Sequence, residues 1–220
     1  MAILLHIDTA VDTASVCLSN DENPIKLAVN DNQKDHAAWL HNTIQHLLEE
    51  AGMTIKDLDA VAVSIGPGSY TGLRVGLSAA KGLCYALGIP LITPGTLEIM
   101  ANAVKNKDAD LICPLIDARR MEVFTAIYDS SLKEVKKPYA MIINESSFSE
   151  VLSSNKVIFC GNGRKKLQTV LSDNNAIFST DIATAVDMCP LSSRYFREKK
   201  FSDVAYTEPL YIKEFFFIKG

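Results

Sequence analysis

The sequence lacks the marks of several common protein classes. Its five cysteines are scattered singly, with no C-x-x-C pair and no Cys/His spacing suited to zinc, which favours buried, reduced thiols in a cytosolic protein. Low-complexity segments are absent. No apolar run is long enough to cross a membrane, and the first residues carry no basic segment. We therefore expect a soluble, cytoplasmic protein without a membrane span.

Positive charge is in deficit as well. The chain has 22 Lys and Arg residues against 26 Asp and Glu residues, a formal net charge of -4. Because a surface of that sign repels polyanions, we expect any nucleic acid that the protein serves to be held by another subunit. The 220 residues, 48% of them hydrophobic, suffice for one large domain or two small ones.

Two halves of the chain follow one plan. A strand over residues 3–7 ends in Asp8 and returns as a hairpin, and a strand over residues 111–116 does the same after Asp117. Later in each half a strand runs into a Gly-x-Gly turn and a helix; these turns are Gly66-Pro-Gly68 and Gly161-Asn-Gly163. The matching order and the approximately matching spacing indicate a diverged internal duplication.

This arrangement resembles that of the actin-like ATPases. It predicts an α/β fold of two duplicated lobes, each with a mixed sheet and flanking helices. We expect the lobes to cover residues 1–105 and 106–205, with residues 206–220 able to pack on the first lobe. The helices are expected over residues 35–50, 71–87, 96–104, 145–153, 164–171 and 190–199.

The helix expected over residues 71–87 carries little bulk and is apolar nearly all round. Gly72, Gly76 and Ala80 lie four residues apart on one face, and Leu73 and Leu77 mark another. Since an ordinary surface helix keeps one wet face, this helix should be covered twice, once by its own sheet and once by a partner protein.

The helix expected over residues 35–50 adds a second candidate face. Beside its core stripe it places Trp39, Thr43 and His46 at spacings of three and four residues. A lone tryptophan beside polar residues is a common interface anchor. The predicted partner surface therefore comprises His36, Trp39, Leu40, Thr43, Gly72, Leu73, Gly76, Leu77 and Ala80.

Two explanations of these helices remain open. One helix pair from each of two proteins can form a four-helix interface, or both helices can simply cover their own sheet. Under the first explanation, a bulky residue at Gly76 should block association and leave the fold intact.

A weaker candidate is an anion contact where the glycine turn meets the helix. The segment from Gly66 to Gly72 lacks the Lys-[Ser/Thr] ending of a P-loop, but a helix N-terminus can still receive an anion. The candidate residues are Asp8, Gly66, Gly68 and Ser69. A tight strand-to-helix turn accounts for the glycines equally well, and Asp8 and Asp117 can simply cap their own turns.

Four segments together resemble the TsaB (YeaZ) family of tRNA threonylcarbamoyladenosine biosynthesis proteins. They are Ile7-Asp-Thr-Ala10, the stretch from Gly66 to Gly76, Ile116-Asp-Ala-Arg-Arg-Met-Glu-Val-Phe124 and Glu208-Pro-Leu-Tyr-Ile-Lys213. The resemblance implies a non-catalytic scaffold for forming N6-threonylcarbamoyladenosine at position 37 of tRNAs reading ANN codons. It also implies a TsaD-type catalytic partner, a TsaE-type ATPase, only indirect contact with tRNA, and self-association through the same surface when the chain is alone.

The resemblance also bears on catalysis. The catalytic relatives bind a metal through H-x-x-x-H, whereas here His36 is followed at that spacing by Leu40. We therefore expect no metal site, no catalytic residue and no tightly bound cofactor in the isolated chain. ATP or ADP at the joint with the catalytic subunit remains open. The alternatives are an active actin-like ATPase or carbamoyl-type transferase and, with less support, a metallopeptidase; Phe215-Phe-Phe217 is either a further contact or folds back on the body.

Overall fold

The first lobe is built around a five-stranded mixed sheet. The computed structural model describes residues 1–31 and 36–213. The strands are β1 (Ile3–Asp8), β2 (Ala14–Asn20), β3 (Asn23–Asn30), β4 (Ala60–Val63) and β5 (Leu91–Ile92). They lie in the order β3-β2-β1-β4-β5, with β2 antiparallel to both neighbours and β1, β4 and β5 mutually parallel.

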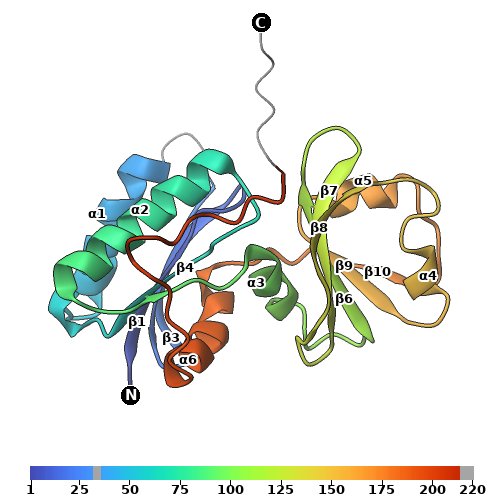
Figure 1. Cartoon of the computed structure of the whole chain (residues 1–220). Coiled ribbons are helices and arrows are strands. Elements are labelled where there is room, and N and C mark those ends of the chain that lie inside the picture. The colour runs from blue at the N-terminus through green and yellow to red at the C-terminus, as the bar shows by residue number, and fades with distance from the viewer. Residues whose placement is uncertain (32–35, 214–220) are drawn as a thin grey trace, which may run out of the picture.

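The second lobe repeats this sheet. Its strands are β6 (Leu111–Asp117), β7 (Glu122–Asp129), β8 (Glu134–Ile142), β9 (Val157–Cys160) and β10 (Ala176–Phe178). Read from β8, their order β8-β7-β6-β9-β10 matches the first sheet strand for strand, with the same parallel and antiparallel pairs. The predicted actin-like fold of two duplicated lobes is therefore confirmed (Figure 1).

Each expected helix is present, although its ends differ. The helices are α1 (His36–Glu50), α2 (Tyr70–Leu87), α3 (Thr96–Asn102), α4 (Ser149–Leu152), α5 (Arg164–Gln168) and α6 (Cys189–Arg197), with 3-10 turns η2 (Ile55–Asp57) and η3 (Ala185–Met188). The second-lobe helices α4 and α5 are much shorter than α1 and α2. Residue 35, the expected first residue of α1, lies outside the described residues.

Helices α1 and α2 cover one face of the first sheet. Leu40 and Ile44 of α1 and Leu77 of α2 are buried in one cluster with Leu5 and Val61 of the sheet. The apolar stripe of α1, at spacings of three and four residues, therefore faces the sheet as the periodicity predicts.

Two helices contact the sheet of the opposite lobe, and the expected lobe boundaries at residues 105 and 205 stay a prediction. Met100 of α3 belongs to the cluster of Ile112 and Ile158 in the second lobe. Leu191 of α6 belongs to the cluster of Leu4 in the first lobe. The chain thus crosses between the lobes after β5 and again after β10 (Figure 1).

The C-terminal segment, defined here as residues 201–213, runs along the first lobe and reaches the second (Figure 1). Ser202 N donates to Leu91 O at 2.8 Å, and Leu210 N donates to Ile65 O at 2.8 Å. Lys213 Nζ then donates to Glu122 Oε2 in the second lobe at 2.7 Å. Residues 215–217 lie outside the described residues.

All five cysteines are buried and free, as expected for reduced thiols. No helix within residues 1–31 and 36–213 has the length and apolarity that crossing a bilayer requires.

Candidate functional site

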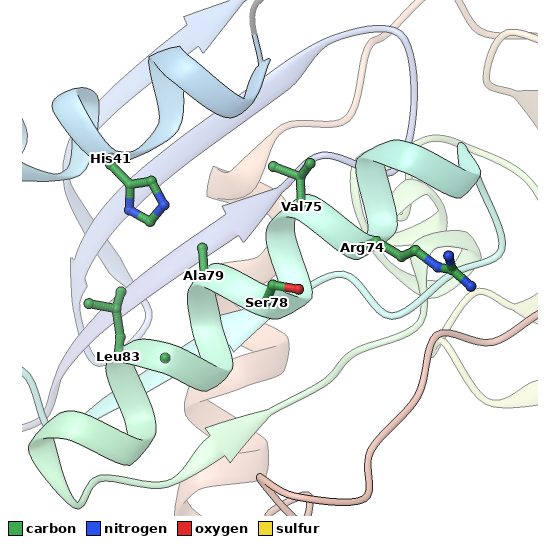
Figure 2. Close-up of a pocket in the computed structure, with 7 residues that line it drawn as sticks. His41, Arg74, Val75, Ser78, Ala79 and Leu83 are labelled. Carbon is green, nitrogen blue, oxygen red and sulfur yellow. The ribbon is translucent and has the colours of Figure 1, made fainter.

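The candidate site is a groove between α1 and α2 on the outer side of the first lobe. It has a volume of about 520 Å³ and is lined by His41, Arg74, Val75, Ser78, Ala79, Gly82 and Leu83, which we call the α1–α2 groove. Figure 2 shows Val75, Ala79 and Leu83 pointing from successive turns of α2 toward His41 of α1. The floor of the groove is therefore apolar, and polar side chains stand at its rim.

Local sequence fixes the ends of α2. The Ser69 side chain caps the helix by accepting a hydrogen bond from Gly72 N at 3.3 Å. At the other end Gly88 adopts a φ of 67°, the left-handed conformation that favours glycine and stops a helix. The rigid helix between these caps presents Val75, Ala79 and Leu83 as one stripe.

The small residues of α2 face inward, not toward a partner. A Cβ atom at Gly72 would overlap the carbonyl oxygen of Thr9, and one at Gly76 would overlap Thr9 Oγ1. Ala80 is fully buried against the first sheet. The glycines thus let α2 approach the β1–β2 turn, and a bulky side chain at Gly76 should strain this packing within the chain.

The other predicted interface residues divide in the same way. Leu40, Leu73 and Leu77 are buried within the chain, so these side chains are not exposed to a partner. Trp39 and Thr43 are half-buried beside the first-lobe core, and Trp39 packs against it. The structure describes His36 only as the first residue of α1, without its side chain.

Polar side chains lie on the outward side of α2, and the C-terminal segment covers part of that side. The Arg74 guanidinium lies 3.8 Å from the centre of the Tyr70 ring and donates to Tyr211 Oη at 3.2 Å, a bond that raises the pKa of Arg74. Lys81 Nζ donates to the carbonyls of Ala205 and Thr207, both at 3.0 Å. The segment therefore borders one side of α2 and leaves the α1 side open.

Asp8 caps its own turn at the end of β1. Its Oδ1 accepts hydrogen bonds from Ser64 Oγ at 2.7 Å and from Ala10 N at 3.1 Å. Burial raises the pKa of this carboxyl, and the two hydrogen bonds oppose the shift.

Asp117, at the end of β6, is more exposed and accepts from Lys166 Nζ at 2.6 Å and from Arg119 N at 2.7 Å. Partial desolvation raises the pKa of Asp117, but the bonds from Lys166 and Arg119 outweigh it and the net shift is downward. Both carboxylates thus have partners within the chain.

The glycine turn before α2 packs against the chain itself. A Cβ atom at Gly68 would overlap the Ala10 carbonyl oxygen, which also accepts a hydrogen bond from Ser69 N at 2.6 Å. Gly66 has a φ of 119°, and an added Cβ would lie 2.6 Å from Leu210 O. The close approach of two backbone segments explains these glycines without an anion.

A contact that the sequence did not reveal joins the two lobes. Asn162 Nδ2 donates to Asp12 Oδ2 at 3.0 Å, and Asn162 Oδ1 accepts from Asp117 N at 2.9 Å. Val11, next to Asp12, packs against the second-lobe cluster that contains Ile116. The first hairpin turn is therefore inserted against the second lobe.

Within the described residues, no three His, Cys, Asp or Glu side chains gather in a way that could hold a metal ion. The groove residues Val75, Ala79, Gly82 and Leu83 were not singled out from the sequence. The spacing of four residues between Val75, Ala79 and Leu83 was a usable signal, but the glycine and alanine residues on the inward face were interpreted as the partner surface instead.

The fold and the sequence comparisons define the class of protein. Two sheets with the same strand order, each contacted by a helix from the other lobe, form an actin-like fold. The family model of TsaD, tRNA N6-adenosine threonylcarbamoyltransferase, matches residues 30–207. A structure described as YeaZ from Pseudomonas aeruginosa superposes with a TM-score of 0.84 at 23% identity, covering 96% of this chain and 100% of that one.

Sequence relatives narrow the class to one family. The tRNA threonylcarbamoyladenosine biosynthesis protein TsaB of Buchnera aphidicola is 31% identical over 171 residues, which cover 76% of this chain and 81% of the relative. TsaB of Escherichia coli is 29% identical over 96% of this chain and 94% of its own length. TsaB of Bacillus subtilis is 35% identical over 57% of this chain and 54% of its own length. The chain belongs to the TsaB (YeaZ) family.

Proposed function

We propose that the chain is a non-catalytic scaffold subunit of the machinery that forms N6-threonylcarbamoyladenosine in tRNA. In this proposal it pairs with a TsaD-type catalytic subunit, works with a TsaE-type ATPase and meets tRNA only through those proteins. The net charge of -4, which disfavours direct binding of a polyanion, supports the indirect contact. In this proposal the modification of tRNA takes place in the cytoplasm.

The observation that carries the proposal is the α1–α2 groove. Val75 and Leu83 are half-buried there and Ala79 is nearly buried, so the groove leaves apolar surface on a rigid helix open to solvent. Such a surface between two helices fits the helices of a second protein, whose side chains can fill the groove. A second copy of this chain can use the same face when the catalytic partner is absent.

Contacts at the first hairpin support the non-catalytic part of the proposal. Asp8 is buried and accepts two hydrogen bonds, and Asp12 is held by Asn162 of the second lobe. Val11 fills space against the second-lobe core. These side chains serve the packing of the chain, which supports a non-catalytic role.

Gly82 offers the sharpest test of the groove. It is exposed in the groove, and a Cβ atom added there meets nothing within 4 Å. Gly82→Arg should fill the groove with a charged side chain and weaken association with the TsaD-type partner by at least about tenfold, or ~1.4 kcal/mol. Analytical ultracentrifugation of the mixed proteins measures this change.

Gly82→Ala is the matched control. Alanine at an exposed helix interior position should stabilise the chain by about 0.5–1 kcal/mol and leave association unchanged. Glu150→Arg on the exposed surface of α4 controls for added positive charge. Unchanged association of Gly82→Arg would reject the groove as the interface.

The scaffold role has its own test. Calorimetric titration of the pure chain with ATP and Mg²⁺ should give no tight binding and no turnover. Analysis of modified nucleosides in tRNA made with and without this chain should show that the product depends on its presence. Tight ATP binding with turnover by the chain alone would favour an active actin-like ATPase or transferase instead.

A further inference from the structure

Two buried cysteines from distant parts of the chain meet beneath the first sheet. Cys17 lies on β2 and Cys189 begins α6, and their Sγ atoms are 3.7 Å apart. Both residues are fully buried in the cluster that joins α6 to the first sheet. The contact is thus part of the packing that carries α6 from the second half of the chain onto the first lobe.

We propose that Cys17 and Cys189 are a reversible thiol–disulfide pair that peroxide oxidises, fastening α6 covalently to the first sheet. A disulfide needs its sulfurs about 2.05 Å apart, so each Sγ has to move by roughly 0.8 Å from its present place. Rotation of the two side chains about χ1 supplies a movement of that size.

The remaining cysteines lack such a partner in the described structure. Cys113 and Cys160 lie on the neighbouring strands β6 and β9 but belong to clusters on opposite faces of that sheet. Cys84 donates to Pro90 O at 3.4 Å within the first-lobe core. Geometry therefore selects one pair among the five thiols.

The surroundings also favour the thiolate form of Cys189. The hydrogen bond from Cys17 lowers the pKa of Cys189 despite burial, and the nearby His6 imidazole lowers it further. His6 pairs with Cys17 in the β1–β2 ladder, and its Nε2 shares a hydrogen bond with Ser19 Oγ at 2.8 Å. Among the described residues, the buried Nδ1 atom of His6 has no hydrogen-bond partner. Burial raises the pKa of Cys84 to about 11 and that of Cys160 to about 12.

The chemistry balances with hydrogen peroxide as the oxidant. Cys189 gives up its proton, and the thiolate attacks one peroxide oxygen. The O–O bond breaks, Cys189 becomes a sulfenic acid, and the leaving hydroxide takes up the released proton to become water. Cys17 sulfur then attacks the Cys189 sulfur, the S–O bond breaks, and the oxygen leaves as water with the proton from Cys17. Two thiols and one peroxide give one disulfide and two waters, and a dithiol reductant reverses the reaction.

Peptide mapping of the full chain tests the pair directly. The protein is treated with a small excess of hydrogen peroxide, denatured in the presence of an alkylating agent that traps free thiols, and digested. We expect the peptides of Cys17 and Cys189 to be linked, so that alkylatable thiols fall from five to three. Dithiothreitol should restore all five.

Variants provide the matched comparison. Cys17→Ser and Cys189→Ser should each abolish the linked peptide, and Cys84→Ser should retain it. The oxidised wild type should also unfold at a higher urea concentration than the reduced protein, a difference that Cys189→Ser should lose. Peptide mapping of the wild type still tests the proposal if a variant fails to fold. Linkage of other cysteines, or conversion of Cys189 to sulfinic acid without linkage to Cys17, would overturn the proposal.

Discussion

The side chain of Asn162 in the second lobe donates to the Asp12 carboxylate in the first lobe at 3.0 Å. The same amide accepts a hydrogen bond from Asp117 N at 2.9 Å. Asn162 therefore connects two hairpin turns that occupy equivalent places in the duplicated lobes. It also lies in the Gly161-Asn-Gly163 turn, the counterpart of the glycine turn before α2.

Removal of the Asn162 side chain should loosen the contact between the lobes. Asn162→Ala loses both hydrogen bonds, and we expect the free energy of unfolding to fall by about 1–2 kcal/mol. Urea unfolding followed by circular dichroism measures the change. Asn106→Ala, at an exposed position, is the control and should be neutral. Equal stability of the two variants would show that the two hydrogen bonds of the Asn162 side chain contribute nothing net.

Gly76 and Gly82 should respond oppositely to a larger side chain. Gly76→Val places a Cβ atom onto Thr9 Oγ1, so α2 or the β1–β2 turn has to shift, at a cost of about 1–3 kcal/mol. Gly82→Ala meets open space and should be stabilising. Thermal unfolding of both variants measures these changes. A Gly76→Val protein as stable as the wild type would contradict the packing described for α2.

Stability should depend on pH through Asp8. Burial raises the pKa of its carboxyl above the ordinary value of 3.8, so the folded protein binds this proton more tightly than the unfolded chain. The free energy of unfolding should therefore fall as the pH rises from near 3.8 through the folded-state pKa of Asp8, and this loss should stay constant at higher pH. Asp8→Asn removes the ionisation and keeps an acceptor for Ser64.

We thus expect the wild type to lose stability relative to Asp8→Asn as the pH rises through this window. Urea unfolding of both proteins from about pH 4 to pH 7 gives the difference. A difference that is independent of pH, or one that favours the wild type as the pH rises, would contradict the raised pKa.

Lys81 should hold the C-terminal segment to α2. Lys81→Met keeps the aliphatic stem and loses the hydrogen bonds to the carbonyls of Ala205 and Thr207. We expect faster amide exchange and faster proteolysis within residues 201–213, with a loss of about 1 kcal/mol in global stability. Lys105→Met is the control, and identical exchange in the two variants would exclude an anchoring role.

Much of the fold was predictable because turns are local features. Asp8 and Asp117 end equivalent strands and the two Gly-x-Gly turns follow in the same order, which sufficed for the duplication and the actin-like plan. The placement of α3 and α6 was not predictable. Periodicity shows that a helix has an apolar face, but not which of two similar sheets that face will cover.

The candidate site was predicted only in part. The two helices were named, but small residues such as Gly72 and Gly76 were interpreted as a face for another protein. Small residues indicate that two backbones approach closely, and nothing in the local sequence says that the second backbone is the chain's own β1–β2 turn. Trp39 and Thr43, which are half-buried on α1, remain compatible with the proposed interface.

The course of residues 201–213 has a mechanical consequence. Leu210 is hydrogen-bonded to the first lobe, and Lys213 forms an ion pair with Glu122 of the second. Any rotation of one lobe against the other must therefore stretch the C-terminal segment or break the ion pair. Residues 201–213 thus limit how far the lobes can move apart. A chain shortened at residue 200 should have a wider range of lobe angles, visible as a larger radius of gyration in solution scattering.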